Sequence, residues 1–233
     1  MNKTFFSIIC TAFVFATLNS CTVGTTNPPP APLSFLMVVH ASPDAPNLDV
    51  IANSQTIASN FAYGASTEYL SAAPATYQIR MAPTTTTTYL IDTTLAMIDG
   101  KAYTLFAIDS LSKIKTVKVE DNFTTPPSDS SRIRLFHFSP DAPSVDIAVT
   151  GGDLLYSHRF FNDQNTNPVL AQFITLAAGT YNLEVRLAGT SIVLLALPNI
   201  PLGGGKVYTF YAKGFAGGSG AQSLSLGTII NSQ

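Results

Sequence analysis

A twelve-residue pattern that occurs twice constrains the fold of this chain more than any other feature. Residues 39–50 read Val-His-Ala-Ser-Pro-Asp-Ala-Pro-Asn-Leu-Asp-Val, and residues 136–147 read Phe-His-Phe-Ser-Pro-Asp-Ala-Pro-Ser-Val-Asp-Ile. Two further matches follow in the same order, between residues 75–80 and 179–184 and between 101–107 and 206–212. Each repeat is therefore about 100 residues long, which is the usual size of a domain with its own core. The chain is expected to contain two tandem copies of one domain.

The repeat and the local composition together give the expected domain boundaries. A short Pro-containing segment separates the two copies and is interpreted as a stiff linker. We expect a lipoprotein signal peptide at 1–20, a Pro/Thr-rich tether at 21–32, repeat one at 33–124, the linker at 125–130 and repeat two at 131–233.

Apolar and polar residues alternate with a period of two in several segments, and this pattern is typical of half-buried strands. Tyr77, Ile79 and Met81 alternate with polar or small neighbours, and the corresponding segment of repeat two behaves in the same way. Gly- and Pro-containing turns separate these segments. We therefore predict an all-β protein with two tandem Ig-like or transthyretin-like antiparallel β-sandwich domains, each with seven or eight strands.

The N-terminal residues predict export. Lys3 precedes an apolar run at 5–18, which is shorter than the roughly 20 residues of a membrane-spanning helix. The run ends in Leu18-Asn19-Ser20-Cys21, which resembles the bacterial lipobox, where cleavage leaves a cysteine that carries lipid. The resemblance implies lipid attachment at Cys21 and a membrane partner, with the outer membrane favoured and its face left open. A plain signal peptide with an incidental cysteine is the alternative.

Composition excludes some functions. The formal net charge is −2 and charged residues make up only 11% of the chain, so no basic field is available to hold nucleic acid. Only Cys10 and Cys21 are present, and both precede the repeats. The repeats therefore contain no disulfide, no thiol nucleophile and no thiolate metal site.

The repeated motif resembles a bacterial family known as domain-of-unknown-function family 4397. The resemblance rests on the Ser-Pro-Asp-Ala-Pro motif in both copies, on residues 60–64 and on the turn at 179–181. It implies exported Ig-like or transthyretin-like β domains on cell envelopes, often in tandem, and no established activity. Ala75 stands where the family turn usually has glycine, and residues 160–162 depart from its Phe-x-x-Gly pattern.

One imidazole and two carboxylates lie near the motif in each copy. They are His40, Asp44 and Asp49 in the first copy and His137, Asp141 and Asp146 in the second. Such a group could bind a metal or a ligand, or act in acid–base chemistry. It could equally be structural, with Asp accepting backbone N–H bonds in the turn and the prolines fixing the corner. Because the group recurs in both copies, the structural interpretation is favoured and no metal site is assigned.

Two adjacent aromatic residues, Phe160 and Phe161, lie in a polar Asn-rich insert of repeat two and form a candidate contact loop. No catalytic motif is found, so no catalytic residue and no cofactor are assigned. We expect a non-enzymatic cell-envelope lipoprotein that binds or scaffolds an envelope glycan or another envelope protein. The alternatives are a glycan- or metal-dependent binding module that uses the His/Asp corner, and a hydrolase.

Overall fold

The computed structural model describes residues 31–231. The predicted signal peptide, the predicted lipid-attachment residue Cys21 and nearly all of the predicted tether lie outside this range. The contacts divide the chain into two units, Met1–Ala31 and Pro32–Gln233, and the description below concerns the second. Within residues 31–231, no helix has both the length and the apolar character needed to cross a membrane.

The described residues form an all-β structure, as predicted, with eight strands in each copy and two four-stranded sheets per copy. Short 3₁₀ helices interrupt the loops. Repeat one contains β1 (Ser34–His40), β2 (Leu48–Ala52), β3 (Gln55–Phe61), β4 (Leu70–Ala72), β5 (Thr76–Pro83), β6 (Ile91–Ala96), β7 (Ala102–Ile108), η1 (Leu111–Lys113) and β8 (Lys115–Asp121). Repeat two contains β9 (Ser130–His137), β10 (Val145–Val149), β11 (Leu154–Arg159), η2 (Asp163–Asn165), η3 (Pro168–Ala171), β12 (Ile174–Ala177), β13 (Gly179–Leu187), β14 (Val193–Leu202), β15 (Lys206–Lys213), η4 (Gly220–Gln222) and β16 (Ser225–Ile230).

The two copies share one topology. The sheets of repeat one have the strand orders β4-β1-β7-β8 and β3-β2-β5-β6, and those of repeat two have β12-β9-β15-β16 and β11-β10-β13-β14. Each copy contains one parallel pair, β1 with β7 and β9 with β15, among otherwise antiparallel neighbours. The register also repeats, since Leu36 faces Leu70 and Ile133 faces Ile174. Residues can therefore be equated between the copies position by position.

Each sandwich has a core of its own. In repeat one, Leu36 and Val38 from β1 pack with residues such as Ile79 from the facing sheet. In repeat two, Ile133 and Val185 occupy comparable places. The alternation predicted around Tyr77 is present in β5, where Ile79 and Met81 are buried. Each repeat therefore has a hydrophobic core between its own two sheets.

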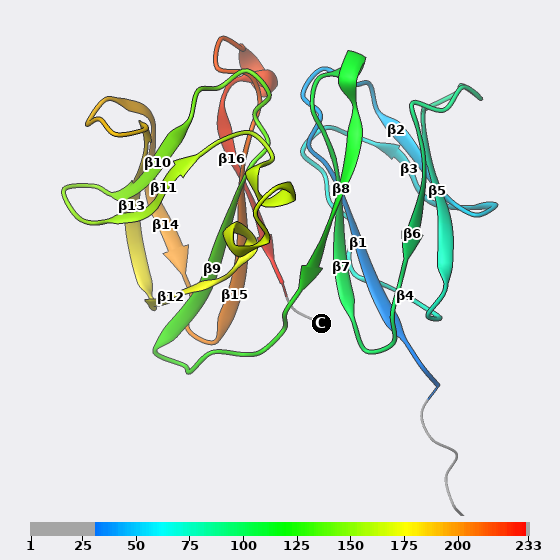
Figure 1. Ribbon diagram of the computed structural model, residues 1–233, viewed down its shortest axis with the longest axis horizontal. Helices are drawn as coiled ribbons and strands as arrows, with labels where there is room; N and C mark the ends of the chain where they lie inside the picture. The colour runs from blue at the N-terminus through cyan, green and yellow to red at the C-terminus, as the bar shows by residue number, and fades with distance from the viewer. Residues whose placement is uncertain (1–30, 232–233) are drawn as a thin grey trace, which may run out of the picture. The chain divides into compact units, whose positions relative to one another are not determined.

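The inner sheets of the two copies also pack against each other, which sequence analysis did not predict. Figure 1 shows β1, β7 and β8 of repeat one facing β9, β15 and β16 of repeat two, so the four sheets form four successive layers. All seven residues of β7 are consequently buried, because both faces of its sheet are covered. A strand of an antiparallel sheet with one wet face would instead alternate between buried and exposed residues.

Aromatic rings fill this shared interface. The Phe106 ring centroid lies 4.9 Å from that of Phe138, 5.4 Å from that of Tyr211 and 5.9 Å from that of Phe136. Phe106 belongs to repeat one and the other three rings to repeat two, and all four are buried. Rings at these separations gain more than their buried area alone provides. The two repeats therefore share a third hydrophobic core.

Candidate functional site

The two predicted corner histidines, His40 and His137, are the last residues of the inner strands β1 and β9. Both rings are buried. His40 Nε2 lies 3.1 Å from the carbonyl oxygen of Pro46, and His137 Nε2 lies 3.3 Å from the carbonyl oxygen of Pro143. Burial lowers the pKa of both histidines, since the charged imidazolium would lose its hydration. Nδ1 of each ring has no hydrogen-bond partner among the described residues. Each histidine thus braces the proline corner from inside the protein.

The first aspartate of each motif ties the corner to a distant loop. Asp44 Oδ1 accepts a hydrogen bond from the backbone N–H of Leu111 at 2.7 Å, at the start of η1. Asp141 Oδ1 accepts one from the backbone N–H of Ala216 at 2.8 Å, in the loop after β15. Both carboxylates therefore fasten the motif to the loop that follows the inner parallel strand of the same repeat.

The second aspartate of each motif bonds to the neighbouring strand. Asp49 Oδ1 accepts from the backbone N–H of Asn60 at 2.8 Å, and Asp146 Oδ1 accepts from that of His158 at 2.7 Å. Asn60 and His158 both have a φ of 50°, a left-handed conformation that costs a non-glycine residue energy. Asp146 Oδ2 also accepts from Gly189 at 2.8 Å. Desolvation raises the pKa of Asp146, but these two backbone donors, together with the charges of His158 and Arg186, outweigh it and lower the pKa.

The three polar side chains of each corner thus have separate partners, most of them backbone groups. This geometry fits the structural interpretation of the motif, in which each side chain fixes a different part of the turn. Within residues 31–231, no group of three His, Cys, Asp or Glu side chains is placed to hold a metal ion.

The two phenylalanines of the candidate contact loop differ in environment. Phe160 is 49% exposed, whereas Phe161 is partly buried against the shared core. Lys115 of repeat one places its ammonium 5.0 Å from the Phe161 ring centroid. Tyr63 occupies the equivalent place in repeat one, and the ammonium of Lys213 from repeat two lies 4.4 Å from the Tyr63 ring centroid. Phe161 therefore belongs to an internal cation–π contact between the repeats, and only Phe160 remains free at the surface.

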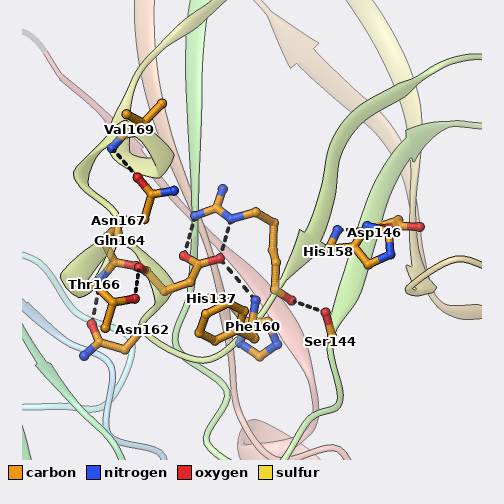
Figure 2. Close-up of polar contacts among 12 residues, drawn as sticks. His137, Ser144, Asp146, His158, Phe160, Asn162, Gln164, Thr166, Asn167 and Val169 are labelled. Atoms are coloured by element: carbon orange, nitrogen blue, oxygen red, sulfur yellow. Dashed lines mark hydrogen bonds and ion pairs between the residues drawn. The ribbon is translucent and has the colours of Figure 1, made fainter.

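A buried ion pair shapes the insert of repeat two. Arg159 donates from Nε to Asp163 Oδ2 at 2.6 Å and from Nη2 to Asp163 Oδ1 at 2.7 Å, a two-pronged contact in which both side chains are essentially unexposed. Figure 2 shows the polar contacts of this region, with His137, Phe160 and Gln164 labelled. The equivalent of Arg159 in repeat one is Phe61, because these residues pair with Val145 and Leu48 in the same register. Repeat two has thus replaced an apolar residue by an ion pair that holds η2 in place.

A second buried ion pair crosses the shared interface. The guanidinium of Arg134 in repeat two contacts the carboxylate of Asp121 in repeat one, and the two side chains are 1% and 0% exposed. Asp121 also accepts from Thr104 Oγ1 at 2.7 Å and from Tyr69 Oη at 3.0 Å. Asn231 Nδ2 donates to Tyr69 Oη at 2.8 Å. Side chains from both repeats therefore complete one buried polar network, which fixes how the two inner sheets meet.

A cleft of about 530 Å³ opens beside this network, between β8 of repeat one and η2–η3 of repeat two. Its walls carry amide, guanidinium and carboxylate groups over a partly apolar floor. It is lined by Val117, Lys118, Val119, Glu120, Asp121, Asn122, Arg132, Arg134, Gln164, Asn165, Pro168, Ala171, Gln172 and Phe173. Gln164 is 5% exposed, and its Oε1 has no hydrogen-bond partner in the described part of the chain. A buried acceptor without a partner calls for an explanation such as a water or ligand donor.

Sequence analysis missed this cleft, because its two walls come from different repeats. One signal was present in β9, where Arg132 and Arg134 alternate with the apolar residues Ile133 and Leu135. Ile133 and Leu135 face the core of repeat two, so the two arginines point to the opposite face of the sheet. The sequence does not show that another layer covers this face, because the burial of Arg134 is seen only in the structure.

Comparison with known families supports the repeat-one assignment. Residues 34–148 match the family described as Domain of unknown function (DUF4397), and this range runs from β1 through nearly all of β10. The chain therefore contains one domain of this family. The matched range includes β9 and most of β10, and the residues after it supply the other strands of the second, similar β region. No curated protein matches the chain.

Proposed function

We propose that this protein is a binding module of the bacterial cell envelope and that it binds an envelope glycan in the cleft between β8 and η2–η3. The observation that carries the proposal is that residues of both repeats line the cleft and that the buried Gln164 Oε1 in its wall has no hydrogen-bond partner among the described residues. Ligand sites commonly lie where two structural units meet, with a few polar groups that fix orientation. On this proposal residues 131–233 are a second copy of the family domain, recruited to complete the site.

The walls of the cleft suit a ligand with many neutral hydroxyl groups. Asn165 and Gln172 are exposed on the repeat-two wall, and each amide can donate and accept hydrogen bonds at once. Arg132 adds fixed donors, while Val117 and Val119 give the floor an apolar surface. A sugar presents both adjacent hydroxyl groups and apolar C–H faces, so it can satisfy both kinds of surface.

The walls are also held rigid before any ligand arrives. The Arg159–Asp163 pair fixes η2 on one side, and the Arg134–Asp121 pair fixes β8 against β9 on the other. Fixing the binding groups in advance lowers the entropy lost on association. This rigidity supports recognition of a repeating polymer by a short, preformed site.

The test measures binding to purified glycans. A fragment of residues 22–233, which contains the whole compact unit Pro32–Gln233, would be screened on an array of bacterial polysaccharides and peptidoglycan fragments. The best glycan would then be titrated by calorimetry. The double substitution N165A/Q172A should weaken binding about tenfold or more, because two exposed hydrogen-bonding side chains are lost. The matched control is Gln222→Ala, in the exposed η4 outside the cleft.

Binding that is unchanged in N165A/Q172A, or equally weakened in the Gln222→Ala control, would refute the cleft as the site. Absence of binding to every glycan on the array would refute the ligand class.

We also propose that a lipid on Cys21 holds this module at the outer membrane. The lipobox-like residues before Cys21 support this assignment, and several acyl chains give more stable anchoring than one. The substitution Cys21→Ser should abolish incorporation of labelled palmitate and release the protein from membranes. Protease treatment of intact and lysed cells would then distinguish the outer face from the periplasmic face. Palmitate incorporation that persists in Cys21→Ser would contradict the anchoring proposal.

A further inference from the structure

Repeat one contains a second pocket, away from the glycan cleft, where its two sheets part at one side. It lies between β3 and β4, each of which is the edge strand of its sheet, and its volume is about 470 Å³. It is lined by Leu36, Gln55, Thr56, Ile57, Leu70, Ser71, Ala72, Tyr77 and Met97. Leu36 and Met97 are buried members of the repeat-one core, so the pocket reaches from the surface into that core.

The chemistry of the lining is uniform in one respect: none of its residues is charged. Leu36, Leu70 and Met97, with Ile57 and the Tyr77 ring, supply apolar surface. The polar groups are an amide and hydroxyls, and Gln55, Thr56 and Ser71 are all exposed residues. A ligand that enters far enough to reach Leu36 and Met97 must be apolar there. Its polar end would meet neutral hydrogen-bonding groups at the exposed positions.

Repeat two carries larger side chains at the positions equivalent to Ala72 and Thr56, which line the pocket, and to Ala58, which lies on the same strand as Thr56. Ala72 faces Ser34 in β1, and its counterpart Leu176 faces Ser131 in β9. Thr56 faces Ile51, and its counterpart Leu154 faces Ala148.

The largest difference is at Ala58, which faces Val50. Its counterpart Tyr156 faces Ile147 and donates from Oη to the carbonyl oxygen of Ile133 at 2.9 Å. Tyr156 thereby spans from one sheet of repeat two to the other.

The contrast between the copies bears on what the pocket does. Protein cores are close-packed, and spaces larger than a water molecule are few. Leu176 and Tyr156 pack against the core of repeat two, whereas the smaller Ala72 and Ala58 stand at the same places in repeat one, and Ala72 lines the pocket. The same fold can therefore accommodate large side chains at this position, and repeat one keeps it open.

We propose that the pocket between β3 and β4 binds one hydrocarbon chain that carries an uncharged polar head group. The hydrocarbon lies along Leu36, Ile57 and Met97, and the head group hydrogen-bonds with Gln55, Thr56 or Ser71. This ligand is of a different class from the glycan proposed for the cleft, and the two sites are independent.

The experiment uses the fragment 22–233 and the uncharged fluorescent probe N-phenyl-1-naphthylamine. The wild-type fragment should bind one probe molecule per chain, with a rise in fluorescence that saturates. The substitution Ala72→Leu, which copies repeat two, should weaken probe binding at least tenfold, and Ala58→Tyr should do the same independently. The matched control is Ala177→Leu, the same substitution at an exposed position of β12. Thermal unfolding of each variant confirms that it is folded.

Competition identifies the head group. Dodecan-1-ol should displace the probe, whereas dodecanoate and dodecyltrimethylammonium at equal concentration should displace it at least tenfold less effectively, because no charged side chain lines the pocket. The double substitution Y156A/L176A in repeat two should raise the number of bound probe molecules from one to two.

Probe binding that is unchanged in both folded Ala72→Leu and Ala58→Tyr variants would overturn the site. Equal displacement by the three competitors would overturn the uncharged head group. Because N165A/Q172A alters only the glycan cleft, it should bind the probe like the wild type, so failure of one proposal is distinguishable from failure of the other.

Discussion

Replacing Asp121 by asparagine should destabilise the protein by about 3–5 kcal/mol, the usual cost of leaving one member of a buried ion pair without its partner. Asparagine has nearly the shape of aspartate, so Asp121→Asn opens no cavity and changes chiefly the charge. Arg134 is 1% exposed and Asp121 is 0% exposed, so solvent cannot replace the lost carboxylate. The interaction lost is of order 4 kcal/mol for unit charges about 4 Å apart at an effective dielectric constant near 20.

The remaining contacts do not compensate for this loss. Thr104 and Tyr69 donate to Asp121, and an asparagine oxygen can still accept from them. The new amide N–H groups, however, would face the guanidinium of Arg134 or the amide of Asn231, which are donors. The buried guanidinium keeps only its bonds to Thr209 Oγ1 and the Glu120 carbonyl oxygen.

The measurement is urea unfolding of the fragment 22–233 at neutral pH, followed by circular dichroism. The matched control is Glu120→Gln on the same strand, since Glu120 pairs with Lys101 in an ion pair that is about half exposed. An exposed pair contributes about 0–1 kcal/mol, so this control should change little. The double substitution D121L/R134M removes both charges and should be less destabilising than Asp121→Asn alone. A loss below about 1 kcal/mol in Asp121→Asn would refute a desolvated pair between the repeats.

Two further predictions concern the shared core and the corners. Phe106→Ala should cost about 3–5 kcal/mol, and calorimetry should show both repeats unfolding in one transition; two separate transitions in the parent protein would contradict a shared core. Burial lowers the folded-state pKa of His40 and His137, so the unfolded chain binds more protons below about pH 6.5. The free energy of unfolding should therefore be highest above that pH. As the pH is lowered further, it should decrease by at most about 1.4 kcal/mol per pH unit for each histidine. Urea unfolding from pH 7.5 to 5.0 measures this, and a flat profile would be inconsistent with buried neutral imidazoles.

Much of the fold could be predicted from local patterns. The alternation around Tyr77 identified β5, and the repeat identified a second sandwich of the same design. These features depend on residues that are close in sequence, or on the repeat itself, so the sequence carries them directly.

The packing between the repeats could not be predicted in the same way. Tyr103, Leu105 and Ala107 alternate along β7 and form the face that packs in the core of repeat one. Thr104 and Phe106 on the other face are also buried, but only because repeat two covers them. Which surface of a second domain covers a sheet depends on contacts between residues far apart in sequence, and one sequence does not specify them.

The site residues also differ in whether their contacts lie within one repeat or form only after the chain has folded. The corner residues His40, Asp44 and Asp49 were found because a conspicuous motif contains them, and their contacts are largely local to repeat one. Arg134 and Gln164 were missed, because their environments exist only after the two repeats have packed or the insert has folded. Repetition thus pointed to residues that build the turn, while the cleft depends on residues that differ between the copies.

The position of β1 has a mechanical consequence. The segment that enters the folded unit at residue 33 continues directly into β1, which lies inside its sheet between β4 and β7 and not at an edge. A pull on the N-terminus would therefore load two hydrogen-bonded ladders at once, three residue pairs with β4 and six with β7. Because both faces of β1 are also covered, extraction would need to break the four-layer packing around it. Resistance to force from this end would then be governed by the rate of unfolding.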